Sequence, residues 1–372
     1  MLRIYLMLQE YFTPIKDNTE YKPYHIGSSI ARYASLFPDL ATKRIALFAI
    51  RGEVNNQHAV RTHLYNLASN AALENILVDL GDIPAGETPA DTNSAIYTVA
   101  LELMSKGIIP VLLTHSVDSG QALYQAFESA NKQIELAWIS AHLPLLEYEL
   151  LHRIIAHEPN YLQNLSAIGF QSHHIPPKAM MLLENLNFDH YRLGEVNNQI
   201  DDAELYLRNA SLTLFDLNAV KHTDAPATQQ VQANGLTAEQ ACQLARYAGA
   251  SDTLQSFALL GYHSDKDHTE LTAALCAQII WYLADGVLSR KQDTPQLHTE
   301  FTKYRCDFSN EDVPILFIKS KRTGRWWMQI EHPAYPENID KRITVPCTYH
   351  DYLEAANGDT PQRYLNALKK LD

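Results

Sequence analysis

Short apolar runs alternate along the chain with longer stretches in which apolar residues recur every three or four positions. Runs without polar interruption are typical of strands buried on both faces of a parallel sheet, and the amphipathic stretches between them are typical of helices. This alternation predicts an α/β fold with a doubly wound, mainly parallel sheet and helices on both faces. The predicted strands span 44–50, 75–80, 108–114, 134–140, 165–170, 211–217 and 254–262, and the clearest helices span 95–107 and 238–250.

The pattern changes after about residue 310. The runs VPILFIKS and RWWMQIE flank KRTG, which predicts an antiparallel hairpin, and YHDYLEAAN predicts a short helix after it. No linker rich in Pro, Gly or Ser separates this part, so we expect an α/β domain over 1–310 with the hairpin and helix of 311–372 packed on it. Within the hairpin, we expect one ring of the pair Trp326-Trp327 in the core and the other at an edge or subunit contact. An aromatic ligand platform is the alternative.

The net charge and the spacing of the cysteines limit the partners and the cell compartment that we expect. The net charge is −13 and the pI is about 5.6, so phosphate backbones are repelled and nucleic acid is not an expected partner. The longest basic cluster is KSKRTGR at 319–325. The four cysteines form no C-x-x-C pair, and no uninterrupted apolar run reaches the roughly 18 residues of a membrane span. We expect a reduced, cytoplasmic protein without membrane contact, compatible with a homo-oligomer, whose partner is an unidentified small molecule or protein.

Polar residues with ligand chemistry follow three of the predicted strands. His115 comes after the strand at 108–114, and His142 comes two residues after the strand at 134–140. Asp216 stands near the end of the strand at 211–217. Ligands of such sheets bind at the carboxyl ends of the strands, so we expect these three side chains to lie in one cleft. Two imidazoles and one carboxylate form a recognised metal-binding set.

The order of these segments resembles the ureohydrolase superfamily, which comprises the arginases, agmatinases and formimidoylglutamases. The resemblance is carried by LLTHS, SAHLP and TLFDLNAVKHTDAP, which stand in the order of the family's three metal motifs. The segment at 234–262 is similar to bacterial arginase-like proteins labelled formimidoylglutamase, as are RWWMQIEHP and the C-terminal helix region. The resemblance covers roughly residues 40–370. It implies an arginase-like sheet and, in the family, a dinuclear manganese site.

Carried over by position, the resemblance places the family's ligands on His115, His142 and Asp216. Two manganese ions need several carboxylates to balance their charge, and most of the family's acids have no counterpart in this chain. The resemblance therefore implies a degenerate metal site with no cofactor, or at most one divalent ion, manganese or zinc, on these three residues. The positions at which family acids are substituted are Ser140, Pro144, Asn218 and Gly261.

Two functions remain open from the sequence. In the first, the protein is a pseudoenzyme that has lost the dinuclear manganese site and serves a binding or structural role. In that case we expect Asp216 to accept hydrogen bonds from a histidine, Asn218, Ser140 or water. In the second, it is a C–N hydrolase of a guanidino, amidine or formimino substrate that uses one metal ion or a non-standard site. The pair His173-His174 also follows a strand and would face the same cleft or solvent, and 263–268 is predicted to be a solvated loop.

Overall fold

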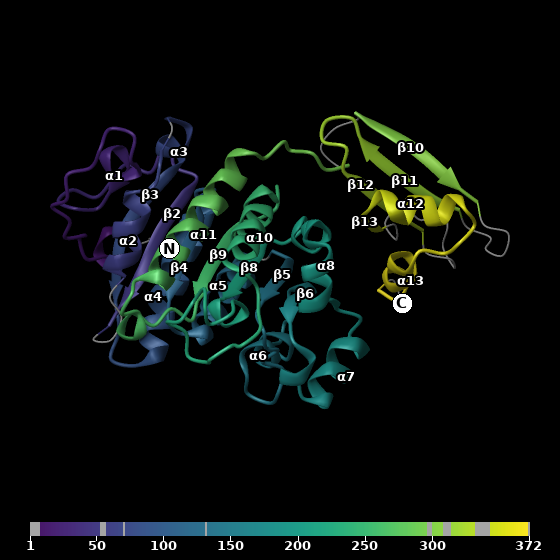
Figure 1. Cartoon of the computed structure of the whole chain (residues 1–372), viewed down its shortest axis with the longest axis horizontal. Helices are drawn as coiled ribbons and strands as arrows, with labels where there is room; N and C mark the ends of the chain where they lie inside the picture. The colour runs from purple at the N-terminus through teal and green to yellow at the C-terminus, as the bar shows by residue number, and fades with distance from the viewer. Residues whose placement is uncertain are drawn as a thin grey trace, which may run out of the picture.

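The computed structural model describes residues 8–52, 57–69, 71–130, 132–295, 300–307, 314–331 and 343–370. These residues form a nine-stranded sheet covered by helices and a four-stranded sheet that lies at one end of the molecule's long axis (Figure 1). The two sheets correspond to the two sequence patterns, the strand and helix alternation and the C-terminal hairpin.

All strand pairs of the larger sheet are parallel, in the order β1-β3-β2-β4-β9-β8-β5-β6-β7. The prediction of a doubly wound parallel sheet is confirmed, and all seven predicted strands are present. The two unpredicted strands, β1 and β7, are the edge strands. Their bounds are Ala31–Arg32 for β1, Ile45–Arg51 for β2, Leu77–Pro84 for β3, Ile109–Thr114 for β4, Ile134–Ile139 for β5, Leu162–Phe170 for β6, Asp189–Arg192 for β7, Leu212–Asp216 for β8 and Ser256–Leu260 for β9.

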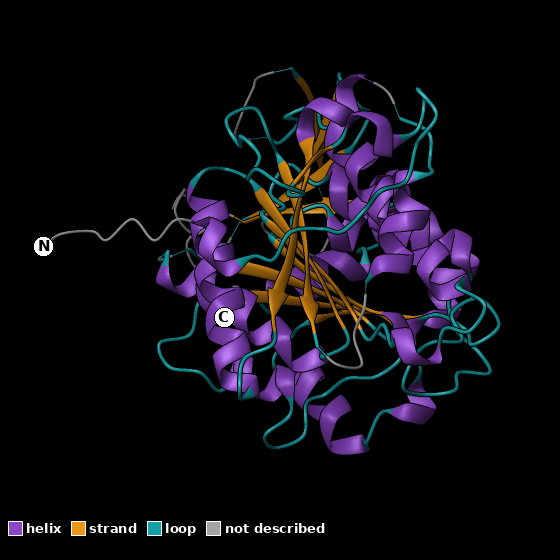
Figure 2. Cartoon of the chain, turned by 90° about the vertical axis from the view of Figure 1, so that its left-hand side faces the viewer, coloured by secondary structure: helices purple, strands orange, loops and turns teal. Residues whose placement is uncertain are grey.

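Helices cover both faces of this sheet, as the view along its edge shows (Figure 2). Strand residues alternate between the two layers: Ile45 and Leu47 of β2 belong to one apolar cluster, whereas Ala46 and Phe48 belong to the other. The first cluster includes residues of α2 (His58–Tyr65), α3 (Ala71–Ile76), α8 (Leu193–Asn198), α9 (Ala203–Leu207), α10 (Ala238–Ala250) and α11 (Leu271–Leu288), with α1 (Ile26–Ser29) beside them. The second includes residues of α4 (Pro89–Ser105), α5 (Gly120–Ser129), α6 (Leu150–Ile155) and α7 (Pro177–Asn185).

Helix α11 is the most apolar of the described helices. It is also the one helix among the described residues that is long and apolar enough to cross a membrane. Most of it is buried against the sheet and α10, which makes it a core helix of this fold. Its contact with α10 is a backbone contact, because a Cβ atom at Gly249 would lie 2.1 Å from the carbonyl oxygen of Leu283.

The smaller sheet is antiparallel, in the order β10-β11-β12-β13. The predicted hairpin is the pair β11 and β12, and β10 and β13 extend it on either side. The predicted helix is α12. The bounds are Phe301–Cys306 for β10, Ile315–Ser320 for β11, Trp326–Ile330 for β12, Ile343–Cys347 for β13, Tyr349–Ala356 for α12 and Gln362–Leu368 for α13. One face of this sheet, with both helices, forms an apolar cluster of its own.

The opposite face of the smaller sheet contacts the larger unit through α9. Arg208, at the end of α9, donates from Nη1 to the carbonyl oxygen of Trp326 at 2.7 Å, and its guanidinium lies 4.9 Å from the ring centre of Trp327. Arg325 pairs with Glu204 of α9 at 3.1 Å. The smaller sheet starts with Phe301 of β10. The division of the chain into domains at residue 310 stays a prediction.

Candidate functional site at the carboxyl edge of the sheet

The predicted site residues lie at the carboxyl ends of four adjacent strands. Strands β4, β9, β8 and β5 are neighbours in the sheet, so the segments that follow them meet at one edge. This edge is the point at which ligands bind in open α/β sheets. The residues that these strand ends contribute are His115 after β4, Gly261 after β9, Asp216 and Asn218 at the end of β8, and Ser140 and His142 after β5.

Asp216 lies at the centre of a hydrogen-bonded network and is only 4% exposed. Ser140 Oγ donates to Asp216 Oδ2 at 2.7 Å. The backbone nitrogen and Nδ2 of Asn218 donate to Oδ1 at 3.0 and 2.8 Å. Burial raises the pKa of Asp216, and the hydrogen bonds from Asn218 and Ser140 act in the opposite direction. Both carboxylate oxygens thus have donors within the protein, as predicted for Ser140 and Asn218.

His142 is held by Ser140 and by a glutamine. Its backbone nitrogen donates to Ser140 Oγ at 3.1 Å, and its Nε2 lies 2.9 Å from Nε2 of Gln232. Because an amide nitrogen only donates, His142 Nε2 is the acceptor in this pair. Gln232 Oε1 lies 3.1 Å from Nε2 of His174, whose ring is 4.5 Å from that of His142. Burial, and the neighbouring His174, lower the pKa of His142, which favours the neutral ring that this hydrogen bond requires.

Gln232 comes from the segment between β8 and α10, which sequence analysis did not assign to the site. This segment is hydrogen-bonded to the turn that follows β8, since the backbone nitrogen of His222 donates to the Gln232 carbonyl at 2.7 Å. The backbone nitrogen of Gln230 donates to Asn218 Oδ1 at 3.2 Å. Gln232 is 3% exposed, so its amide is built into the protein interior. The available signal was the run TQQVQ, three glutamines within four residues directly after a strand-end motif.

Gly261 packs closely against the Asp216 network. Its φ is +83°, a conformation that side-chain-bearing residues rarely adopt. A Cβ atom here would lie 2.9 Å from Asp216 Oδ1 and 3.4 Å from Asn218 Nδ2. The position onto which the resemblance carries a substrate-orienting glutamate therefore has no room for a glutamate side chain in this arrangement.

The remaining predicted residues are His115, the loop at 263–268 and Pro144. The ring of His115 contacts that of His263 at 5.8 Å, and burial lowers the pKa of both imidazoles. The loop prediction for 263–268 is wrong in part, because Asp267 is buried and accepts from the backbone nitrogen of Ala273 at the start of α11. The carbonyl oxygen of Pro144 accepts from Leu151 at the start of α6.

The donor set does not fit a dinuclear manganese centre. Manganese prefers carboxylate oxygens, and two such ions require several anions, whereas the network around Asp216 is completed by a serine, an asparagine and a glutamine. Within the described part of the chain, no group of three or more His, Cys, Asp and Glu side chains is arranged to hold a metal ion. Binding of a single ion by His115, His142 and Asp216 stays a prediction.

A family model described as Arginase family matches residues 24–285. The structure is similar to Trypanosoma cruzi formiminoglutamase in a crystal structure with Mn²⁺, with a TM-score of 0.62 and 15% identity, covering 72% of this chain and 99% of that one. Formimidoylglutamase from Bacillus subtilis gives a TM-score of 0.63 at 13% identity, covering 74% and 96% of the two chains. Arginase from Bacillus subtilis gives a TM-score of 0.55 at 15% identity, covering 65% of this chain and 98% of that one. A search of curated proteins found no match.

Proposed function

Because the chain belongs to the arginase family, whose model matches residues 24–285, we propose that it is a member in which a hydrogen-bonded network replaces the dinuclear manganese site. In this proposal the protein serves a binding or structural role. The observation that carries the proposal is the environment of Asp216, whose two carboxylate oxygens accept hydrogen bonds from Ser140 and Asn218. Both donors stand where the resemblance places acids.

The charge state of the edge supports this proposal. Burial raises the pKa of Asp216, which weakens its tendency to carry the negative charge that a metal ion requires. Metal-assisted hydrolysis depends on ions that lower the pKa of a bound water. A site with one carboxylate of raised pKa offers little to bind such ions, so hydrolysis by the family's chemistry is not expected.

The alternative is a C–N hydrolase of a guanidino, amidine or formimino substrate that uses one divalent ion or a non-standard site. One observation favours it: His142 and His115 both have lowered pKa values, and the neutral imidazole is the form that ligates metals. The ring of His174 lies 4.5 Å from that of His142 and adds a third imidazole to the same edge.

The proposed setting is the reducing cytoplasm, with a small molecule or a protein as partner. All four cysteines, Cys242, Cys276, Cys306 and Cys347, are buried and free, which supports a reducing compartment.

Metal content and activity test the proposal together. Protein purified without a chelator or a metal-affinity tag should contain far less than one manganese per chain. It should release neither urea from arginine or agmatine nor formamide from formimidoylglutamate when manganese is added. Crystals soaked in manganese should show no pair of anomalous peaks between His115 and His142.

Two results would overturn the proposal. One is a pair of strong manganese peaks at this edge. The other is manganese-dependent product release that disappears in His142→Ala and persists in His268→Ala, a control at an exposed histidine of a neighbouring loop. A single peak with activity would support the mononuclear hydrolase instead.

A further inference from the structure

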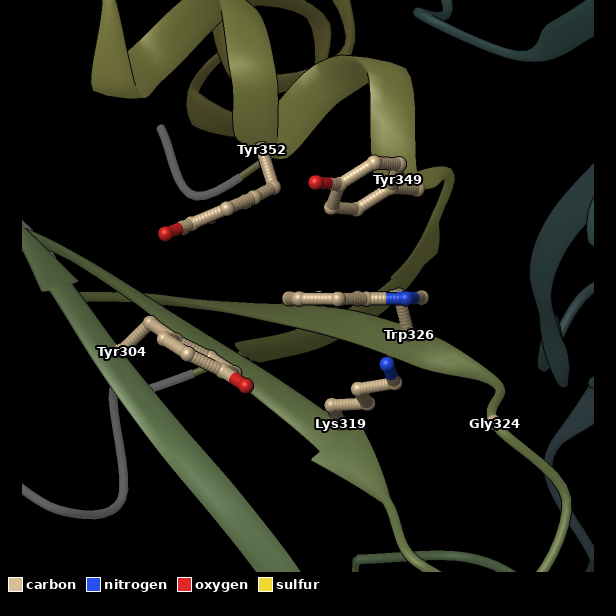
Figure 3. Close-up of a pocket in the computed structure, with 6 residues that line it drawn as sticks. All are labelled: Tyr304, Lys319, Gly324, Trp326, Tyr349 and Tyr352. Carbon is tan, nitrogen blue, oxygen red and sulfur yellow. The ribbon is translucent and has the colours of Figure 1, made fainter.

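The smaller sheet carries an open pocket of about 380 Å³ that is distinct from the edge of the larger sheet. Aromatic rings form most of its wall. Figure 3 shows rings from α12 on one side of the Trp326 ring, and Tyr304 and Lys319 on the other. The lining residues are Tyr304, Lys319, Gly324, Trp326, Tyr349 and Tyr352.

Strand register and helix periodicity bring these residues together. Lys319 of β11 pairs directly with Trp326 of β12, so both side chains project from the same face of the sheet. Tyr349 and Tyr352 stand three residues apart on α12, which places both on one side of that helix. The ring centres of Tyr352 and Tyr304 lie 5.0 and 5.3 Å from that of Trp326, and both pairs are stacked.

The aromatic wall is only partly covered by the protein. Trp326 is 7% exposed and forms the buried floor, whereas Tyr349 is 53% exposed. Tyr364, in the same apolar cluster, is 3% exposed, so the fold is able to bury a tyrosine here completely. The uncovered rings leave flat apolar surface facing the pocket, and such surface is stabilised when a ligand removes it from water.

The pocket also has a positive charge, that of Lys319. The ammonium of Lys319 lies 5.2 Å from the centre of the Trp326 ring, and no described carboxylate forms an ion pair with it. Two of its basic neighbours are already paired, Arg322 with Glu300 and Arg325 with Glu204. Lys319 opens the cluster at 319–325, the longest basic cluster in a chain of net charge −13.

We propose that this pocket binds a small planar anion, one or two conjugated rings that carry a carboxylate or phosphate. The rings lie against Trp326 and the tyrosines, and the anionic group pairs with Lys319. The volume suits a ligand of this size. An aromatic wall alone would equally suit a methylated ammonium ion. The ammonium of Lys319 already occupies a place beside the Trp326 ring, however, and it repels a second cation. This inference goes beyond the proposed function and does not depend on the metal content of the other site.

Matched probes test the ligand class on the full chain by isothermal titration calorimetry. Indole-3-acetate carries an anion on the same ring that tryptamine carries with a cation. We expect indole-3-acetate to bind at least tenfold more tightly than tryptamine. Adenosine 5′-monophosphate against adenosine tests a phosphate as the anionic group, and we expect the nucleotide to bind more tightly than the nucleoside.

Variants assign the effect to the pocket. Lys319→Met should abolish the preference for the anionic probe, and Lys319→Arg should restore it. Lys303→Met is the matched control, because Lys303 is exposed and pairs with Ile318, whose side chain projects from the other face of the same sheet. Tyr349→Ala should weaken the binding of both indole probes. Circular dichroism shows whether each variant is folded.

Three outcomes contradict the proposal. These are tighter binding of tryptamine or tetramethylammonium than of either anion, no binding of any probe at millimolar concentration, and an unchanged anion preference in folded Lys319→Met.

Discussion

The carboxyl edge of the larger sheet and the aromatic pocket of the smaller one differ in whether their polar side chains have partners within the described protein. At the edge, Asp216 receives hydrogen bonds from Ser140 and Asn218, and the amide of Gln232 lies between two imidazoles. In the pocket, Lys319 has no described carboxylate partner, and Tyr349 is more than half exposed. The Asp216 network is satisfied from within, and the pocket is left open.

Under the proposed function, this difference separates an inherited position from a usable one. A strand edge at which ligands bind in related folds is no longer available when internal partners take up its donors and acceptors. A binding site instead keeps some surface that the protein itself does not cover, at a cost in stability. Substitutions that reopen the edge should therefore destabilise the fold, whereas substitutions in the pocket wall should affect ligand binding more than folding.

The largest expected effect is that of Gly261→Glu. A side chain at this φ is strained, and its Cβ atom would lie 2.9 Å from Asp216 Oδ1, so we expect a loss of about 3 kcal/mol or more in the free energy of unfolding. Urea unfolding measures it. Gly107→Glu is the control, because Gly107 has a φ of +73° but nothing within 4 Å of its Cβ position, and it should lose only about 1 to 2 kcal/mol. Equal losses would show that the Asp216 network is not crowded.

Ser140→Ala should lower the free energy of unfolding by about 1 to 3 kcal/mol. The substitution removes a donor to buried Asp216 Oδ2 and an acceptor for the backbone nitrogen of His142. The control is Ser116→Ala, at a half-buried position after strand β4, which should change stability by no more than about 0.5 kcal/mol. A neutral effect of Ser140→Ala in urea unfolding would argue that the edge is hydrated and open.

The pH dependence of stability reports the state of Asp216. Burial raises its pKa above the ordinary 3.8, so its ionised form is disfavoured in the folded state. Its contribution to stability is therefore largest below pH 3.8 and declines as the pH rises through the raised pKa. Asp216→Asn cannot ionise. The unfolding free energy of the wild type minus that of the variant should decrease as the pH rises above 3.8, on a scale of about 1.4 kcal/mol per pKa unit.

Denaturant unfolding at several pH values checks this expectation. Asp359→Asn, at an exposed position, provides the reference for a carboxylate outside the network. A difference that grows in favour of the wild type as the pH rises would instead indicate a carboxylate stabilised by positive charge, as a metal ion would provide.

The smallest expected effect on stability is that of Tyr349→Ala. Because this ring is 53% exposed, its loss should cost only about 0.5 to 1 kcal/mol, mainly through contact with Trp326. Tyr364→Ala, at a buried position in the apolar cluster of the smaller sheet, should lower the free energy of unfolding by about 3 kcal/mol. If Tyr349→Ala destabilises the protein as much as Tyr364→Ala in thermal unfolding, the pocket wall is part of the core.

The strands that sequence analysis found are those with continuous apolar runs. Strand β7, with the sequence DHYR, has no such run because an edge strand is less buried, and β1 has only two residues. In the smaller sheet, β13 contains Pro346 in a moderately exposed edge position, which weakens the strand signal. Apolar periodicity therefore predicts the interior of both sheets better than their edges.

The site was predictable only as far as strand order determines it. Asp216, Ser140 and His142 stand at adjacent strand ends, which the alternation of strands and helices places together. The contact between His142 and Gln232 joins residues 90 positions apart through a segment without regular structure. No local pattern encodes such a contact, so the closure of the edge by Gln232 was not predicted.

The neighbouring tryptophans of β12 connect the pocket with the contact between the smaller sheet and α9. Trp326 forms the pocket floor, and Trp327 lies under the guanidinium of Arg208 at the end of α9. A strand projects successive side chains to opposite sides, so a twist of β12 about its long axis moves both rings at once, in opposite directions. A ligand in the pocket and the contact with α9 therefore meet opposite faces of one strand, with a single peptide unit between the two rings.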